Sequence, residues 1–135
     1  MSKPVETIDG IGSRNGSVLR QAGIGTVEKL LKFGGTRPGR RALAAQTGID
    51  EKQLLRCVNI ADLFRIKGVA GQYAELLEAA GVDTVKELRH RNAGNLAAKM
   101  AQVNADCRLV RVVPSTNRVA RWIFQAKVLR PKVKY

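Results

Sequence analysis

The strongest constraint on the fold is that one stretch of this sequence occurs twice. Residues 8–31 and 66–89 align without a gap, Ile8 with Ile66. Most of their other apolar positions also pair with apolar residues, and a duplication of this kind predicts two copies of one structural unit. The identical positions are Ile8/Ile66, Gly10/Gly68, Leu19/Leu77, Ala22/Ala80, Gly23/Gly81, Thr26/Thr84, Val27/Val85 and Leu30/Leu88.

Glycine and threonine residues mark helix ends in both copies. Gly23 and Gly81 follow apolar helical runs and suit the left-handed position that comes after a helix. Thr26 and Thr84 come next as N-cap candidates, and Glu87 stands three residues after Thr84, the spacing of a capping box. The pattern predicts that one helix ends and another begins at the same place in each copy.

Further helices follow in each copy. Thr36 can cap one helix, with Pro38 in its first turn and Gly48 beyond its end. A long amphipathic helix is predicted next, and its counterpart stands near the end of the second copy. The residues of these two stripes are Leu54, Cys57, Val58 and Ala61 in the first copy and Val119, Trp122, Ile123 and Ala126 in the second.

These patterns predict an all-α protein. The duplicated unit is about sixty residues long, and only residues 108–113 leave the choice between helix and strand open. We expect two tandem repeats, residues 1–65 and 66–130, packed into one compact helical domain. The basic residues 131–135 form a tail that we expect to be mobile.

The charge of the chain favours a polyanionic partner. The net charge is +13, from 24 basic and 11 acidic residues, and residues 108–135 hold eight basic residues and no acidic one. Such a segment attracts nucleic acid through counterion release, whatever its sequence. Charge alone is equally compatible with solubility or with a patch that faces a ribosome or a membrane surface.

Several functional classes find little support in the sequence. No apolar run approaches the roughly 20 residues that span a bilayer, so no membrane insertion is expected, and no secretory signal is recognisable. Cys57 and Cys107 indicate reduced thiols in a cytoplasmic protein, although their pairing stays open. His90 alone cannot build a metal site, the carboxylates are scattered, and no P-loop or nucleophile elbow is present. We therefore expect neither an enzyme nor a bound metal or cofactor.

Each repeat opens on a glycine-containing turn that leads into a helix. The first reads Ile-Asp-Gly-Ile-Gly at residues 8–12, and the second reads Ile-Lys-Gly-Val-Ala at residues 66–70. The small residues Gly16 and Ala74 let the following helix approach what precedes it. Glycine leaves backbone N–H groups uncovered, and the helix N-terminus adds unpaired donors and a positive dipole end. The arrangement is suited to a phosphate group.

Both turns resemble the helix-hairpin-helix motif, which grips the DNA backbone without reading sequence and in some members holds a monovalent cation. The second copy departs from the motif, because Ala70 replaces a hairpin glycine and Gln72 stands where the first copy has Arg14. Asp9 beside the first turn corresponds to Lys67 beside the second. The contact residues that the resemblance implies are Gly10, Ile11, Gly12, Ser13 and Arg14, and Gly68, Val69, Ala70, Gly71 and Gln72.

A closer resemblance covers nearly the whole chain. Residues 54–92, together with NLAAKM, the turn at Pro114, the ending VARWIFQAKVL and the upstream TRPGRRALAAQTGI, are similar to the bacterial family called domain of unknown function 4332. The resemblance implies a tandem helix-hairpin-helix fold and no particular activity. Cys57 stands where the family pattern suggests tryptophan, which we interpret as a change of core volume.

Basic clusters outside the turns complete the candidate surface. Arginines at the start of a helix oppose the helix dipole, so an anionic partner is one reason for them and ordinary solvated charge is another. Trp122 is interpreted as a core residue, with base stacking as the alternative, and Tyr73 either packs or stacks or hydrogen-bonds at a surface. The cationic candidates are Arg37, Arg40, Arg41, Arg118, Arg121, Lys127, Arg130, Lys132 and Lys134.

Two functions are compatible with these observations. In the first, the protein is a non-enzymatic module that binds the nucleic-acid backbone, with DNA favoured over RNA and the nucleoid as its place of action. In the second, the turns are structural and the cationic face docks an acidic protein partner. The sequence leaves the pathway and the oligomeric state open.

Overall fold

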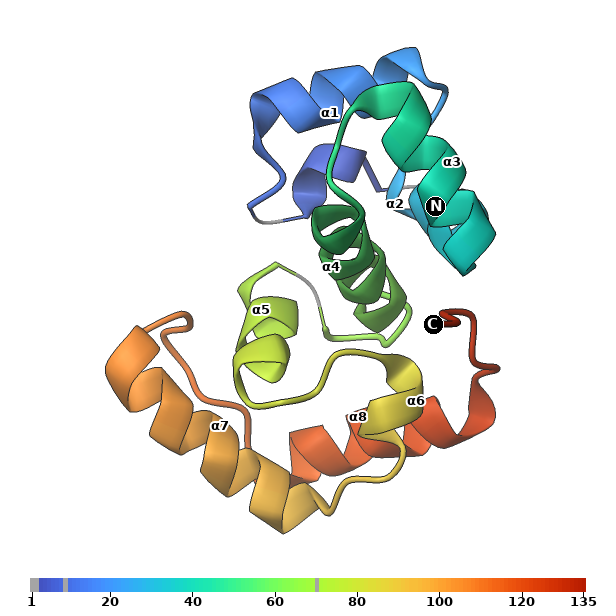
Figure 1. Ribbon diagram of the computed structural model, residues 1–135. Coiled ribbons are helices and arrows are strands. Elements are labelled where there is room, and N and C mark those ends of the chain that lie inside the picture. The colour runs from blue at the N-terminus through green and yellow to red at the C-terminus, as the bar shows by residue number, and fades with distance from the viewer. Residues whose placement is uncertain (1–2, 9, 70) are drawn as a thin grey trace. The chain divides into compact units, whose positions relative to one another are not determined.

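The computed structural model describes residues 3–8, 10–69 and 71–135. Within that part of the chain the regular structure is helical, with eight α-helices, one 3-10 helix and no strand (Figure 1). The all-α prediction is confirmed. The elements are η1 (Val5–Thr7), α1 (Gly12–Gln21), α2 (Val27–Gly34), α3 (Arg37–Thr47), α4 (Glu51–Leu63), α5 (Gln72–Ala79), α6 (Val85–Leu88), α7 (Ala93–Cys107) and α8 (Thr116–Val128).

The helices fall into two compact units. The first unit consists of residues 1–62 and 132–135, and the second of residues 63–131. Helices α1 to α4 belong to the first, except that α4 ends one residue beyond its boundary, and α5 to α8 belong to the second. Each unit thus holds four helices in the same order, with the last residues of the chain assigned to the first unit.

The turn after the first helix is the same in both units. Ile24 N donates a hydrogen bond to Leu19 O at 2.8 Å, and Val82 N donates to Leu77 O at the same distance. These two pairs occupy aligned positions of the duplicated stretch, and all four side chains are buried. The duplication read from the sequence is therefore also a duplication of the backbone hydrogen-bond pattern.

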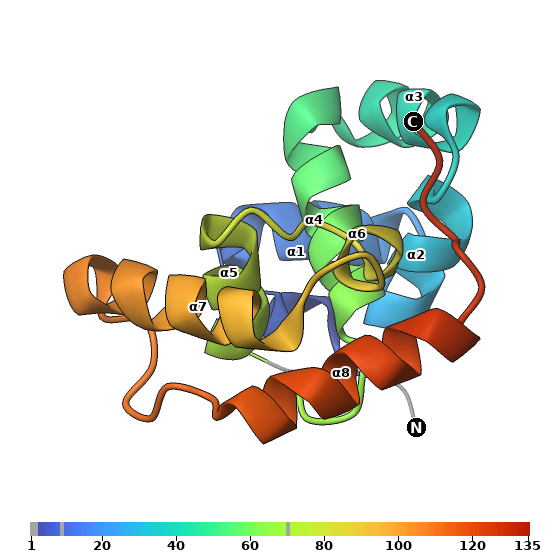
Figure 2. The same cartoon turned by 90° about the horizontal axis from the view of Figure 1, so that it is seen from below.

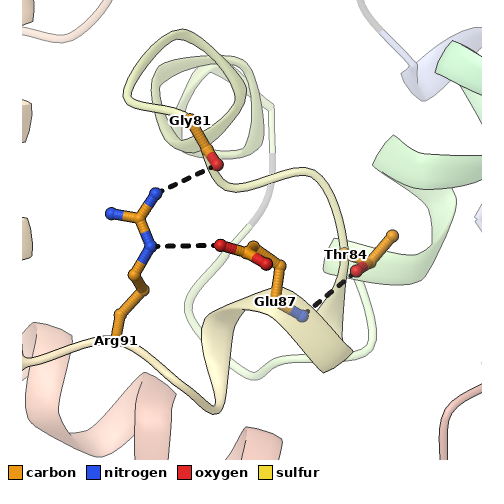
Figure 3. A network of polar contacts seen from close by, with 4 residues as sticks. All are labelled: Gly81, Thr84, Glu87 and Arg91. Carbon is orange, nitrogen blue, oxygen red and sulfur yellow. Dashed lines mark hydrogen bonds and ion pairs between the residues drawn. The ribbon is translucent and has the colours of Figure 1, made fainter.

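The predicted threonine caps are present. Thr26 Oγ1 accepts a hydrogen bond from Lys29 N at 3.1 Å, and Thr84 Oγ1 accepts one from Glu87 N at 3.2 Å. Figure 3 shows the second cap, together with the Glu87 carboxylate, which accepts a hydrogen bond from Arg91 Nε at 3.3 Å. These threonines satisfy an amide that the first helical turn would otherwise leave without a partner.

The last helix of each unit carries the core stripe that the sequence predicts. All eight predicted stripe residues are buried, including Cys57 in α4 and Trp122 in α8. Within the second unit α8 packs against α7 and against α6 (Figures 1 and 2). Residues 108–113, which the sequence left open, connect α7 to α8 without forming a strand.

The small residue Gly16 has a clear role in the first unit. A Cβ atom at Gly16 would lie 3.0 Å from the side chain of Glu6 in η1. That carboxylate accepts two hydrogen bonds from Arg20, from Nε at 2.7 Å and from Nη2 at 2.6 Å. Gly16 therefore makes room for an ion pair between η1 and α1.

Candidate functional site

The two helices that follow the glycine turns differ from the capped helices of the chain. Helices α2, α3, α6, α7 and α8 each begin with a side-chain cap, from a threonine, an asparagine or a serine. Helices α1 and α5 begin with no side-chain cap. No side chain therefore satisfies the first amides of α1 and α5, which are left for water or a ligand.

The first glycine turn is open to solvent. Gly10 and Gly12 have φ angles of 84° and 77°, a left-handed conformation that favours glycine. Gly10, Gly12, Ser13 and Arg14 are exposed, whereas the Ile11 side chain is buried. The first turn of α1 contains no acidic residue. The turn thus presents backbone donors and one arginine, with a buried isoleucine as its anchor.

A second cation supports this turn from α4. The Arg56 Nη1 atom lies 3.1 Å from the position that a Cβ at Gly10 would occupy. The absence of a side chain at Gly10 brings the guanidinium close to the turn backbone. The exposed Arg14 and the positive end of the α1 dipole also lie at this turn. No sequence pattern indicates Arg56, because it stands far from Gly10 along the chain and only the fold brings the two together.

The second glycine turn is packed against its own unit. A Cβ at Gly68 would lie 3.0 Å from Nε1 of Trp122. Gln125 in α8 accepts a hydrogen bond from Lys67 N at 2.8 Å and donates one to Lys67 O at 3.2 Å. Val69 is buried. The side chains of α8 thus occupy the surroundings of this turn, a role of Gln125 that no sequence pattern indicated.

The start of α5 also differs from that of α1. Helix α5 begins at Gln72, two residues later in the repeat than α1, and Gly71 precedes it with φ at 52°. Gln72 is exposed and uncharged where Arg14 stands in the first copy. The predicted contact residue Ala70 lies outside the described residues. The second turn therefore lacks the arginine that follows the first turn.

The arginine cluster of α3 divides into two kinds of residue. Arg37 and Arg41 are exposed, and Arg41 lies 4.0 Å from Glu51. Arg40 is only 4% exposed, and its guanidinium donates to Gly34 O at 2.9 Å and to Lys134 O at 2.7 Å. Burial lowers the pKa of Arg40 below its ordinary value. The assignment of Arg40 to a nucleic-acid surface is corrected: its hydrogen bonds hold the unit together.

The backbone of Lys134 pairs with the junction of α2 and α3. Lys134 N donates to Gly35 O at 2.7 Å, and Lys134 O accepts from Arg40. The mobility expected of residues 131–135 stays a prediction. The side chains of Lys132 and Lys134 remain exposed on the first unit.

The predicted basic residues of α8 have separate roles. The Arg118 guanidinium lies over the ring of Tyr73 at 4.8 Å and over that of Trp122 at 5.6 Å, and it is half-buried. Tyr73 in turn donates to Val112 O at 2.8 Å, which agrees with its predicted packing role. Arg118 therefore tethers the α7–α8 connection. Arg121, Lys127 and Arg130 are exposed.

The structure does not bring all predicted site residues together within one unit. Gly10, Gly12, Ser13, Arg14, Arg37, Arg41, Lys132 and Lys134 lie on the first unit, and Gly68, Gly71, Gln72, Arg118, Arg121, Lys127 and Arg130 on the second. Among the described residues, no group of three His, Cys, Asp or Glu side chains could hold a metal ion. No helix in the described ranges is long and apolar enough to cross a bilayer.

Comparison with known proteins identifies the family of the chain. No curated protein and no solved structure matches it. A family model matches residues 9–129, which is most of the chain and includes both glycine turns and all eight α-helices. The chain therefore belongs to the family described as "Domain of unknown function (DUF4332)".

Proposed function

We propose that this protein is a non-enzymatic nucleic-acid-binding protein that holds the backbone of duplex DNA through its first glycine turn. The observation that carries the proposal is the uncapped, exposed start of α1, which has an exposed arginine in its first turn. Gly12, Ser13 and Arg14 are exposed there, and Arg56 lies close to Gly10. Backbone amides at a helix N-terminus and nearby guanidinium groups are the donors that phosphate groups prefer.

The charge of both units supports a polyanionic partner. The first unit holds twelve basic and six acidic residues, a net charge of +6, and the second holds twelve basic and five acidic residues, a net charge of +7. Phosphate contacts position a protein on DNA without distinguishing bases. We therefore expect binding that depends strongly on salt and little on sequence.

The test is a titration of labelled duplex DNA, followed by fluorescence anisotropy at about 50 and 200 mM salt. Wild-type protein should bind tightly at the lower concentration and much more weakly at the higher. Arg14→Glu should weaken binding to all sequences and lower the salt slope by about one. Lys29→Glu is the matched control, because Lys29 is exposed on α2 of the same unit and its replacement makes the same change in net charge.

Two results would contradict the proposal. No binding at the lower salt concentration would remove nucleic acid as the partner. An equal loss in Arg14→Glu and Lys29→Glu would mean that only the overall charge matters and that the turn has no special part.

A protein partner is the second candidate, and one cavity favours it. The first unit has an open, mostly apolar cavity of about 430 Å³, beside a Phe33 side chain that is half exposed. An acidic protein with one protruding apolar side chain would fit it. Polyglutamate that binds where duplex DNA does not would favour this candidate. The cavity is lined by Ala22, Gly23, Ile24, Phe33, Gly39, Ala42, Leu43 and Gln46.

A further inference from the structure

One face of α8 carries an aromatic ring among cations and is exposed. Phe124 is 69% exposed and Val128, one turn further along, is 70% exposed. Arg121 and Lys127 are exposed on either side of Phe124 along the helix. Residues three and four positions apart share one helix face, so these side chains form a single surface, which we call the α8 face.

The corresponding face of the first unit is buried. In the alignment that pairs the stripe of α8 with that of α4, Phe124 corresponds to Asn59, Lys127 to Asp62 and Val128 to Leu63. These three residues of α4 are at most 8% exposed. The second copy has therefore placed an aromatic ring and a cation where the first copy has residues shielded from solvent.

A cavity adjoins Phe124 where the start of α7 meets α8. Its volume is about 380 Å³, within the range of small-ligand sites. On one side Arg91 is held in place, because it donates to Gly81 O at 3.1 Å and to the Glu87 carboxylate at 3.3 Å (Figure 3). These contacts use two of the five N–H donors of the guanidinium. The cavity is lined by Arg91, Asn92, Ala93, Ala120, Ile123, Phe124 and Lys127.

The charge of this part of the chain is mostly positive. Residues 88–131 contain nine basic residues and one acidic residue, Asp106 near the end of α7. Glu87, the carboxylate next to this region, is paired with Arg91. A partner for this surface must therefore carry negative charge at close spacing.

The small exposed apolar area of the α8 face favours a nucleic acid over an acidic protein as the polyanionic partner. A stable protein interface buries about 800 Å² on each partner around an apolar centre. The large exposed apolar side chains on the described part of α8 are Phe124 and Val128 alone, which is little for such a centre. A nucleic-acid base needs only one aromatic face on which to stack, with cations nearby for its phosphates.

We propose that the α8 face binds single-stranded DNA, with an unpaired base stacked on Phe124 and the flanking phosphates bound by Arg121, Lys127 and Arg91. This inference rests on the proposed function in taking DNA as the partner. The inference goes beyond that function in placing a second binding site on the second unit and in assigning single-stranded DNA to it. Stacking tolerates every base, so this site also binds without sequence preference.

The test compares a labelled single-stranded oligothymidylate of about 15 nucleotides with a duplex of the same length. Phe124→Ala should weaken oligothymidylate binding roughly 5- to 150-fold, the loss typical of one stacked base. Phe124→Trp should retain binding, since it keeps a stacking surface. Phe33→Ala is the matched control, because it removes an exposed phenylalanine from the other unit. Circular dichroism should show that all variants keep their helix content.

The outcomes separate this inference from the proposed function. Wild-type affinity of Phe124→Ala for oligothymidylate, together with duplex binding that still depends on Arg14, would overturn the α8 site alone. An equal loss in Phe33→Ala and Phe124→Ala would also overturn it. Failure of wild-type protein to bind either DNA at about 50 mM salt would overturn both proposals.

Discussion

The two glycine turns share a left-handed glycine, at Gly10 and at Gly68, and differ in the side chains around it. In the first unit Gly10 lies over the guanidinium of Arg56. In the second unit Gly68 lies over the indole of Trp122, and Gln125 binds both backbone groups of Lys67. The left-handed glycine is common to both copies, while the last helix of each unit places a different side chain beside it. The side chains of that helix, more than the glycines, therefore set the chemical surroundings of each turn.

The largest expected effect comes from the core residue beneath the second turn. Trp122→Ala should destabilise the second unit by about 3–5 kcal/mol, the cost of a large buried cavity. Cys57→Ala, at the equivalent position of α4, should cost only about 1 kcal/mol, near the average for a single substitution. Chemical denaturation followed by circular dichroism measures both. If Cys57→Ala lowers the free energy of unfolding as much as Trp122→Ala does, the loss does not follow the size of the deleted side chain. The two positions would then not be equivalent in packing.

The turn glycines themselves provide the next test. Gly68→Ala combines the strain of a left-handed residue, about 1–2 kcal/mol, with a clash against the buried indole. Gly10→Ala has the same strain, but its neighbour is the end of a flexible arginine. We expect Gly68→Ala to lose more stability and Gly10→Ala to lose more duplex affinity.

Hydrogen exchange, resolved by unit, and DNA titration separate these two losses. If both variants lose stability and duplex affinity to the same extent, the contrast between a supporting turn and a binding turn is wrong.

A further difference between the two units, away from the glycine turns, can be tested at Arg40. It occupies the fourth position after the Thr36 cap, where the second unit has the buried Leu96 after the Asn92 cap. Arg40→Leu should destabilise the first unit by about 1–3 kcal/mol, because the carbonyls of Gly34 and Lys134 lose their donor. Faster amide exchange at Lys134 would show that the C-terminal residues are released. Arg37→Leu, at an exposed site, should change stability by less than about 0.5 kcal/mol.

The sequence predicts local features well and long-range contacts poorly. The caps at Thr26, Thr36 and Thr84 depend on residues three positions away, so they can be read directly. Arg40 resembles an exposed arginine in a basic run, and only the carbonyl of Lys134, at the far end of the chain, makes its burial possible. Phe124 belongs to an apolar helix, and its exposure follows from which face of α8 is packed. Each missed residue depends on a contact that helical periodicity does not specify.

The smallest expected effect is a pH dependence confined to the first unit. The hydrogen bonds from Arg20 lower the pKa of the exposed Glu6 from 4.5 to about 2. A carboxylate with a lowered pKa stabilises the folded state above the pKa of the unfolded chain, and that contribution is lost as the pH falls. We therefore expect the stability of the first unit to decrease from about pH 4.5 to about pH 2, and Glu6→Gln to reduce this dependence. Salt should weaken the effect, since the pair is exposed.

The second unit is the internal control for this ion pair. When the alignment of the two repeats is extended by two positions, Glu6 corresponds to the buried Phe64, and Arg20 corresponds to Glu78. The second copy thus cannot form this ion pair, because the position of Glu6 is taken by an apolar side chain. Hydrogen exchange measured between about pH 5 and pH 2 should show that Glu6→Gln alters the pH dependence of the first unit alone. A comparable change in the second unit would show that the two copies do not unfold separately, so the ion pair would then stabilise the whole chain.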